Sequence, residues 1–149
     1  FRPSTDLQET ALSFYDPSND PLLELYTQQT RSQNLKALHF FKEGNYESAR
    51  YYFEENQPST EQNDITSLFY AITCYETGEG DIATELLNDL LIVGEEVIVY
   101  HAKWYLALIY ISQDQKERAL PYLHEISKTE GIFTRKAEKL ITSLTRRPN

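Results

Sequence analysis

The side chains that most often carry chemistry in proteins are few and scattered in this sequence. His39, His101 and His124 are isolated from one another, whereas metal-binding and metalloprotease motifs place their ligands at short, fixed spacings. No glycine-rich phosphate loop, G-x-S-x-G motif or cysteine–histidine arrangement is present. Cys74 falls on the inner side of an expected helix, where a lone cysteine is more often a small core residue than a nucleophile. The sequence therefore predicts no catalytic, metal or cofactor site, and a protein that is not an enzyme.

Composition limits the elements that could position any site. A chain of 149 residues with 40% hydrophobic and 25% charged side chains is long and apolar enough for one globular domain. Five glycines and six prolines are few, which favours helices over turn-rich sheets. The apolar run at 90–93 ends at Gly94, and no run approaches the roughly 18 residues that a membrane span needs.

The start of the sequence leaves one question open. The chain contains no methionine and begins at Phe1, so an initiator is absent. We therefore expect no membrane span within residues 1–149, and leave open a signal or anchor upstream of Phe1. One cysteine excludes an internal disulfide.

Two alanines mark how the expected helices pack. Ala107 lies in the apolar run of residues 102–111, and Ala119 lies twelve residues later in an amphipathic run. Helices joined by so short a polar break pack antiparallel. A small side chain on each helix, facing the other, would let the two backbones approach closely. A single pair at this spacing is also compatible with chance.

The spacing recurs, which argues against chance. Pairs of alanines twelve residues apart occur three times, and the first members of the pairs are separated by 34 and then 36 residues. A large apolar side chain follows each second alanine by four residues: Phe53, Leu87 and Leu123. Three copies at a period near 34 residues are typical of a helical repeat protein. The pairs are Ala37 with Ala49, Ala71 with Ala83, and Ala107 with Ala119.

These residues resemble the tetratricopeptide repeat. The family has a small residue and an aromatic on the first helix, a glycine-containing turn, and Ala-x-x-x-Phe on the second helix. Gly44-Asn45-Tyr46 and the segment 49–53 match the turn and the second half, Gly78 supplies the second turn, and Asp114 stands at the third. The resemblance covers about residues 30–127. It implies an all-α, right-handed solenoid of about three helical hairpins with a C-terminal capping helix.

The expected domain map follows from the same repeats. We expect residues 1–19 to be extended or loose, and 20–149 to form a single domain of the tetratricopeptide type. Asp20-Pro21 should open a short helix, since aspartate caps helices and proline suits their first position. Asp64 is a plausible cap for another helix, and Pro121 predicts a kink rather than a break. The repeats are expected at about 30–56 (helices 30–42 and 45–56), 64–93 (64–77 and 80–93) and 96–127 (96–111 and 114–127), with a capping helix at about 132–144.

The resemblance also implies a binding groove. In this family the first helices of successive pairs line a concave surface that holds peptides or protein segments. Two alternatives to an open groove remain, namely covering by residues 1–30 or by a second subunit. Relatives that grip a C-terminal carboxylate use lysine and asparagine there, and this chain has Leu38, Ile72 and Glu76 instead, which disfavours that use. The implied lining is Asn34, Leu38, Phe41, Lys42, Leu68, Ile72, Tyr75, Glu76, Trp104, Leu108 and Ile111.

Charge is distributed unevenly along the chain. Residues 51–102 carry eleven acidic side chains and no lysine or arginine, and the whole chain has a net charge of −9. Phosphate binding needs the opposite sign, so nucleic acid is not an expected partner. Two interpretations stay open: a solvated acidic surface, or a surface for a cationic peptide or basic partner.

Two functions compete at this point. The first is a protein–protein interaction module, a scaffold or adaptor that binds a peptide or protein segment in an apolar, aromatic groove with acidic surroundings. The second is the soluble structural or regulatory region of a membrane-anchored bacterial envelope protein that acts through self-association as a homo-oligomer. Family analogy places such regions on the periplasmic side of a bacterial membrane.

Overall fold

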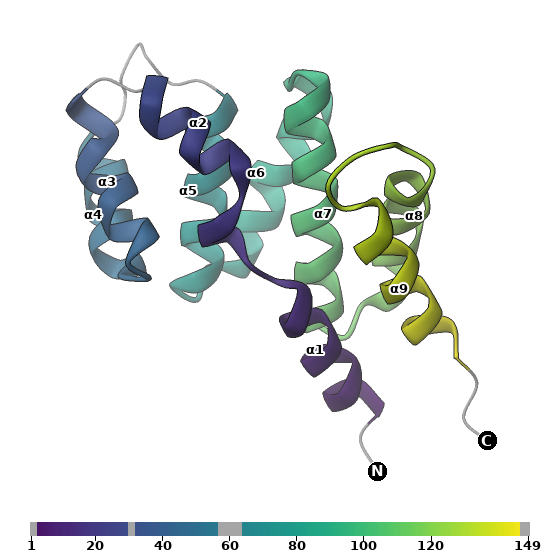
Figure 1. Ribbon diagram of the computed structural model, residues 1–149. Helices are drawn as coiled ribbons and strands as arrows, with labels where there is room; N and C mark the ends of the chain where they lie inside the picture. The colour runs from purple at the N-terminus through teal and green to yellow at the C-terminus, as the bar shows by residue number, and fades with distance from the viewer. Residues whose placement is uncertain (1–2, 30–31, 57–63, 147–149) are drawn as a thin grey trace. The chain divides into compact units, whose positions relative to one another are not determined.

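The computed structural model describes the backbone of residues 3–29, 32–56 and 64–146, and this part of the chain is helical without a strand. Each helix from α2 to α5 packs on the next along the chain, as α8 does on α9 (Figure 1). The helical content confirms the expected all-α class. The elements are α1 (Pro3–Phe14), the 3-10 turn η1 (Pro17–Asn19), α2 (Pro21–Gln29), α3 (Ser32–Lys42), α4 (Tyr46–Glu55), α5 (Asp64–Glu76), α6 (Gly80–Val93), α7 (Glu96–Ser112), α8 (Lys116–Ser127) and α9 (Thr134–Thr145).

The chain divides into two compact units. Unit 1 consists of Phe1–Tyr15 and Val99–Asn149, and unit 2 of Asp16–Ile98. Unit 1 thus joins α1 to the last three helices, and unit 2 holds η1 and α2 to α6 with the start of α7. The first residues thus pack with the end of the chain, whereas the single domain expected over residues 20–149 stays a prediction. Each unit is described separately below.

Three helix-to-helix turns share one backbone conformation. Gly44, between α3 and α4, and Gly78, between α5 and α6, have φ values of +78° and +89°. Asp114, between α7 and α8, has a φ of +61°. Many helices end on a residue in this left-handed region, which glycine adopts without steric cost and aspartate tolerates better than most side chains. The third turn therefore keeps its geometry although the glycine is replaced.

The hydrogen bonds of these turns also repeat. In each turn the N–H group after the left-handed residue donates back to the carbonyl five residues earlier, which is the long bond of a Schellman motif. The motif recurs at spacings of 34 and 36 residues, the period of the alanine pairs. The three bonds, each 2.8 Å, run from Asn45 to Phe40, from Glu79 to Cys74 and from Gln115 to Tyr110.

The paired alanines lie in the cores of the two units. All six have an exposed fraction of 0%, and the large apolar residues four positions after the second alanines are also buried. The observed bounds of α3 to α8 agree with the six expected repeat helices to within two residues. Helical periodicity and turn chemistry thus fixed these helices locally.

The N-terminal residues differ from the expectation of an extended or loose segment. Residues 3–14 form α1, in which Ala11 is buried. Within unit 1 the Nε2 atom of Gln8 donates to the carbonyl of Ser112 at 2.9 Å, and the ring of Phe14 meets that of Trp104 edge-on at 6.5 Å. Helices of this length are marginal alone. The contacts with α7 and α9 therefore stabilise a helix that its own periodicity does not reveal.

Other local sequence features agree only partly with the structure. Asp20 precedes α2 and accepts a hydrogen bond from the Leu22 N–H at 2.9 Å, as a capping side chain does. Asp64 is the first residue of α5 rather than the residue before it. Helix α8 continues through Pro121, so the proline does not break it. Helix α9 begins two residues after the expected start at 132 and packs on α8.

An aromatic cluster joins the helices of unit 1 at the loop before α9. Phe133 stacks on Trp104 with centroids 4.8 Å apart and contacts His101 at 5.0 Å. Its N–H donates to the hydroxyl of Tyr100 at 2.8 Å. A Cβ at Gly131 would lie 2.5 Å from that hydroxyl, so glycine lets the loop approach α7 closely.

Candidate functional site

The residues of the implied groove fall in both units and are mostly buried. Eight lie in unit 2, on α3 and α5, and three lie in unit 1, on α7. Lys42 is exposed, and Tyr75 and Glu76 are half-buried. A role in partner binding stays a prediction for all eleven. The remaining eight have exposed fractions of 7% or less: Asn34, Leu38, Phe41, Leu68, Ile72, Trp104, Leu108 and Ile111.

Helix α2 covers part of this face in unit 2 through Tyr26. The Tyr26 ring lies parallel to that of Phe69 on α5, with centroids 6.3 Å apart. Its hydroxyl accepts a hydrogen bond from the Nδ2 atom of Asn34 at 3.1 Å and also contacts the Thr66 hydroxyl. All four residues are buried, so the Tyr26 hydroxyl meets polar groups of α3 and α5 in a place where an unmade hydrogen bond would be costly.

The edge of the contact between α2 and α3 combines an exposed ion pair with a half-buried tyrosine. The Nζ atom of Lys42 lies 3.3 Å from a carboxylate oxygen of Glu24 on α2. The ring of Phe41 meets that of Tyr46 edge-on at 5.4 Å. Burial raises the pKa of Tyr46 above its ordinary value, whereas the nearby hydroxyl of Ser18 lowers it. The chain's own residues 16–29 therefore occupy the face that the family resemblance assigns to a ligand.

In unit 1 the N-terminal helix makes the corresponding contacts. Phe14 meets Trp104, as described, and Tyr15 meets Tyr105 edge-on with centroids 6.3 Å apart. Trp104, one of the residues of the implied lining, thus contacts both Phe14 and Phe133. Phe14 and Tyr26 thus contact residues of the implied lining within their own units, and covering of the whole groove by residues 1–30 stays a prediction.

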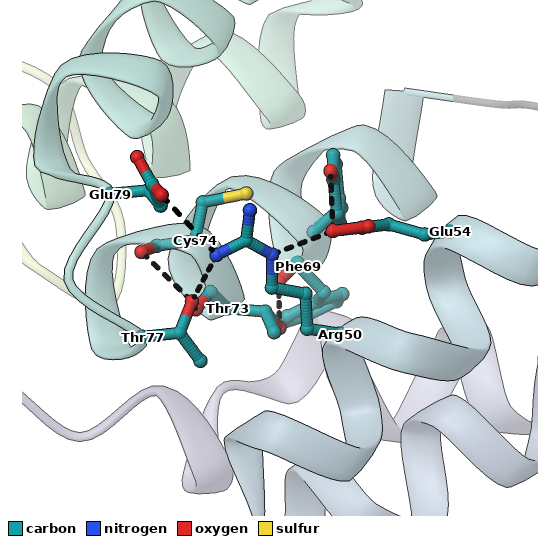
Figure 2. A network of polar contacts seen from close by, with 8 residues as sticks. Arg50, Glu54, Phe69, Thr73, Cys74, Thr77 and Glu79 are labelled. Carbon is teal, nitrogen blue, oxygen red and sulfur yellow. Dashed lines mark hydrogen bonds and ion pairs between the residues drawn. The ribbon is translucent and has the colours of Figure 1, made fainter.

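A polar network around Arg50 joins the first hairpin to the second (Figure 2). The Nε atom of Arg50 on α4 lies 2.6 Å from a Glu54 oxygen, and Nη1 donates to the Thr77 hydroxyl at 3.0 Å. Nη1 also lies 3.9 Å from a carboxylate oxygen of Glu79. The hydroxyl of Tyr70 donates to the same Glu54 oxygen at 3.3 Å. The sequence analysis missed this cluster, although the four-residue spacing of Arg50 and Glu54 is a recognisable signal.

The network does not activate the cysteine beside it. Cys74 is fully buried, as expected for a core residue. Burial raises the pKa of the Cys74 thiol, and the charge of Arg50 offsets this only in part. Burial likewise raises the pKa of Tyr70, and Cys74 raises it further. A thiol held protonated is a poor nucleophile. The contacts of Arg50 and Glu54 with Thr77 and Tyr70 instead link α4 to the second hairpin.

The histidines remain separate from one another. His39 lies 3.3 Å from the Glu43 carboxylate on the surface of α3, and His124 is exposed on α8. His101 is buried against the rings of Tyr100 and Phe133. Among the described residues no three histidine, cysteine or carboxylate side chains gather as a metal site. No described helix combines the length and the apolarity required to cross a bilayer.

Comparison with known proteins gives no assignment. No protein-family model, curated protein or solved structure matches this sequence.

Proposed function

We propose that this protein is a non-catalytic protein–protein interaction module built of tetratricopeptide-like helical hairpins. One observation carries the proposal: the same Schellman turn recurs at spacings of 34 and 36 residues, each time between helices that bear a buried alanine pair. Hairpin repeats of this kind present extended surfaces that suit protein segments rather than small substrates.

The face of α3 and α5 is the first candidate for the binding surface. Helix α2 lies on this face, and Tyr26 is its buried anchor. A partner that uses this face competes with α2, so weakening the anchor should increase binding. The face itself is apolar, and its residues Leu38 and Ile72 are buried.

Peptide selection tests the proposal directly. A random peptide library is displayed against the immobilised full-length chain and against the Tyr26→Ala variant, and enriched peptides are measured by fluorescence anisotropy. We expect specific peptides with micromolar affinity, bound more tightly by Tyr26→Ala than by the Tyr51→Ala control. Tyr51 is 58% exposed on α4, so its loss leaves α2 in place. Failure to enrich any peptide on either chain contradicts an interaction module.

The charge distribution favours a second candidate, self-association. Unit 2 carries 16 acidic and 4 basic side chains, a net charge of −12, whereas unit 1 carries 7 acidic and 10 basic, a net charge of +3. Units of opposite charge on neighbouring copies attract one another. Light scattering of the full chain at low and high salt distinguishes the candidates, because a salt-sensitive oligomer supports self-association and a monomer supports the module.

A further inference from the structure

The outer face of α6 carries apolar side chains that the other described residues of unit 2 leave exposed. Ile92 and Val93 near the end of the helix have exposed fractions of 83% and 69%. Ile82 in its first turn is 39% exposed, and Val97 at the start of α7 is 48% exposed. All four belong to unit 2, and we call them the α6 patch.

Helical spacing gathers these side chains. Ile82 precedes Ile92 and Val93 by ten and eleven residues, about three helical turns, so the three project from one side of α6. The opposite side holds the buried residues Ala83, Leu87 and Leu90. Single exposed apolar residues are common, whereas several on one face mark interaction surfaces.

Carboxylates surround the α6 patch. Asp81, Glu85 and Asp89 recur every fourth residue on the same side of α6, and all are exposed. Glu95 follows in the connection to α7, Glu96 is the first residue of α7, and both are exposed as well. Like charges at four-residue spacing destabilise a helix. Positive charges on a partner would relieve this repulsion.

Unit 2 offers no cation to these carboxylates within its described residues. Glu24 pairs with Lys42, and Glu54 pairs with Arg50. No such ion pair forms at the five carboxylates around the α6 patch, and the sequence has no lysine or arginine between residues 51 and 102. These exposed carboxylates are therefore available to lysine or arginine side chains of a partner.

We propose that the α6 patch docks a basic amphipathic segment of a partner protein. Apolar side chains of the segment cover Ile92, Val93 and Val97, and its lysines or arginines pair with Glu85, Asp89 and the neighbouring carboxylates. The proposal rests on the interaction-module function and names a surface distinct from the face under α2. The net charge of −12 on unit 2 speeds the approach of such a segment at low salt.

Three synthetic peptides serve as probes. The first is an 18-residue helix with leucines on one face and lysines on the other. The second replaces the lysines with glutamates, and the third replaces the leucines with glutamines. Binding of each labelled peptide to the full-length chain is followed by fluorescence anisotropy over a salt series. We expect the first peptide to bind best, and its affinity to fall as salt rises.

Two variant pairs locate the site. We expect Ile92→Ser with Val93→Ser to weaken binding of the first peptide about tenfold or more, as removal of central apolar contacts does. We expect a similar loss, together with a smaller salt dependence, for Glu85→Lys with Asp89→Lys. The apolar control is Leu35→Ser, which removes a 40% exposed side chain on α3. The charge control is Glu130→Lys with Glu138→Lys, both exposed in unit 1. Both controls should bind normally, and circular dichroism should show all variants equally helical.

Each other outcome overturns the proposal. Equal binding of the glutamate peptide removes the charge argument, and equal losses in the control variants show that the site lies elsewhere. If light scattering shows that the full chain forms an oligomer and that the two serine substitutions make it dissociate, the occupant of the α6 patch is a second copy of the chain. If the patch variants bind normally while library peptides still bind the full chain, this inference fails and the interaction module stands.

Discussion

At the scale of the residue, the three Schellman turns have one conformation but two chemistries. The left-handed conformation costs a non-glycine residue roughly 1–2 kcal/mol, less for aspartate. Gly44 and Gly78 avoid this cost, whereas Asp114 bears it at a φ of +61°. A Cβ at either glycine would meet no atom within 4 Å, so backbone conformation alone should decide the effect of a substitution.

Substitutions in these turns should therefore have opposite signs. We expect Asp114→Gly to raise the free energy of unfolding by a few tenths to about 1 kcal/mol, because it removes the left-handed penalty. We expect Gly78→Ala to lower it by about 1 kcal/mol, since the smaller entropy of the unfolded chain offsets only part of the strain. Urea denaturation measures both, and two changes of the same sign would contradict the shared turn geometry.

At the scale of the element, the alanine pairs test how closely the hairpin helices approach. Ala107 on α7 and Ala119 on α8 are fully buried in unit 1. We expect Ala107→Leu or Ala119→Leu to lower the free energy of unfolding by roughly 1–3 kcal/mol through overpacking. Lys139→Leu on the exposed side of α9 is the control and should change it by less than about 0.5 kcal/mol. A neutral result in urea melts for either alanine means that the helices do not need small residues there.

The attachment of α2 makes a second prediction at this scale. Removing the hydroxyl in Tyr26→Phe keeps the stack on Phe69 but leaves the buried Asn34 and Thr66 without that partner. We expect a loss of about 1–3 kcal/mol in the free energy of unfolding. Tyr51→Phe, at an exposed ring, should be neutral. Equal stability of Tyr26→Phe and the parent chain would show that these groups find other partners.

At the scale of the whole molecule, the thiol of the buried Cys74 and the phenol of the half-buried Tyr70 predict a loss of stability in alkali. Burial raises the pKa of Cys74 above 9.0 and that of Tyr70 above 10.0, so the folded chain keeps these protons to higher pH than the unfolded chain. Where the unfolded state binds fewer protons, stability falls as pH rises. The free energy of unfolding should therefore decline from about pH 9 upward and be unaffected by these two groups below it.

A matched variant isolates that contribution. In Cys74→Ala with Tyr70→Phe, the decline above pH 9 should be shallower, although the variant is less stable at neutral pH because it loses buried contacts. Chemical denaturation between pH 7 and 11 provides the measurement. An unchanged slope would mean that other groups cause the alkaline loss, among them Tyr46 and Tyr122, whose pKa values burial also raises.

Local features of the sequence determined much of the fold. Apolar periodicity, the glycines at residues 44 and 78 and the recurring alanines predicted α3 to α9 to within about two residues, because helices and their turns depend on neighbours a few positions away. Asp20 and Pro21 marked the start of α2 in the same way. The buried state of all six paired alanines was likewise predictable from their spacing.

Tertiary structure alone decided what covers these helices. Helix α1 forms where the sequence suggested a loose segment, because Phe14 and Gln8 find partners on α7, about ninety residues or more away in the chain. Tyr26 occupies the face of α3 and α5, and Arg50 reaches Thr77 in the next hairpin. Such contacts join residues far apart in sequence, and periodicity does not encode which segments meet. Local chemistry thus fixed the hairpins, and long-range packing fixed which of their surfaces remain open.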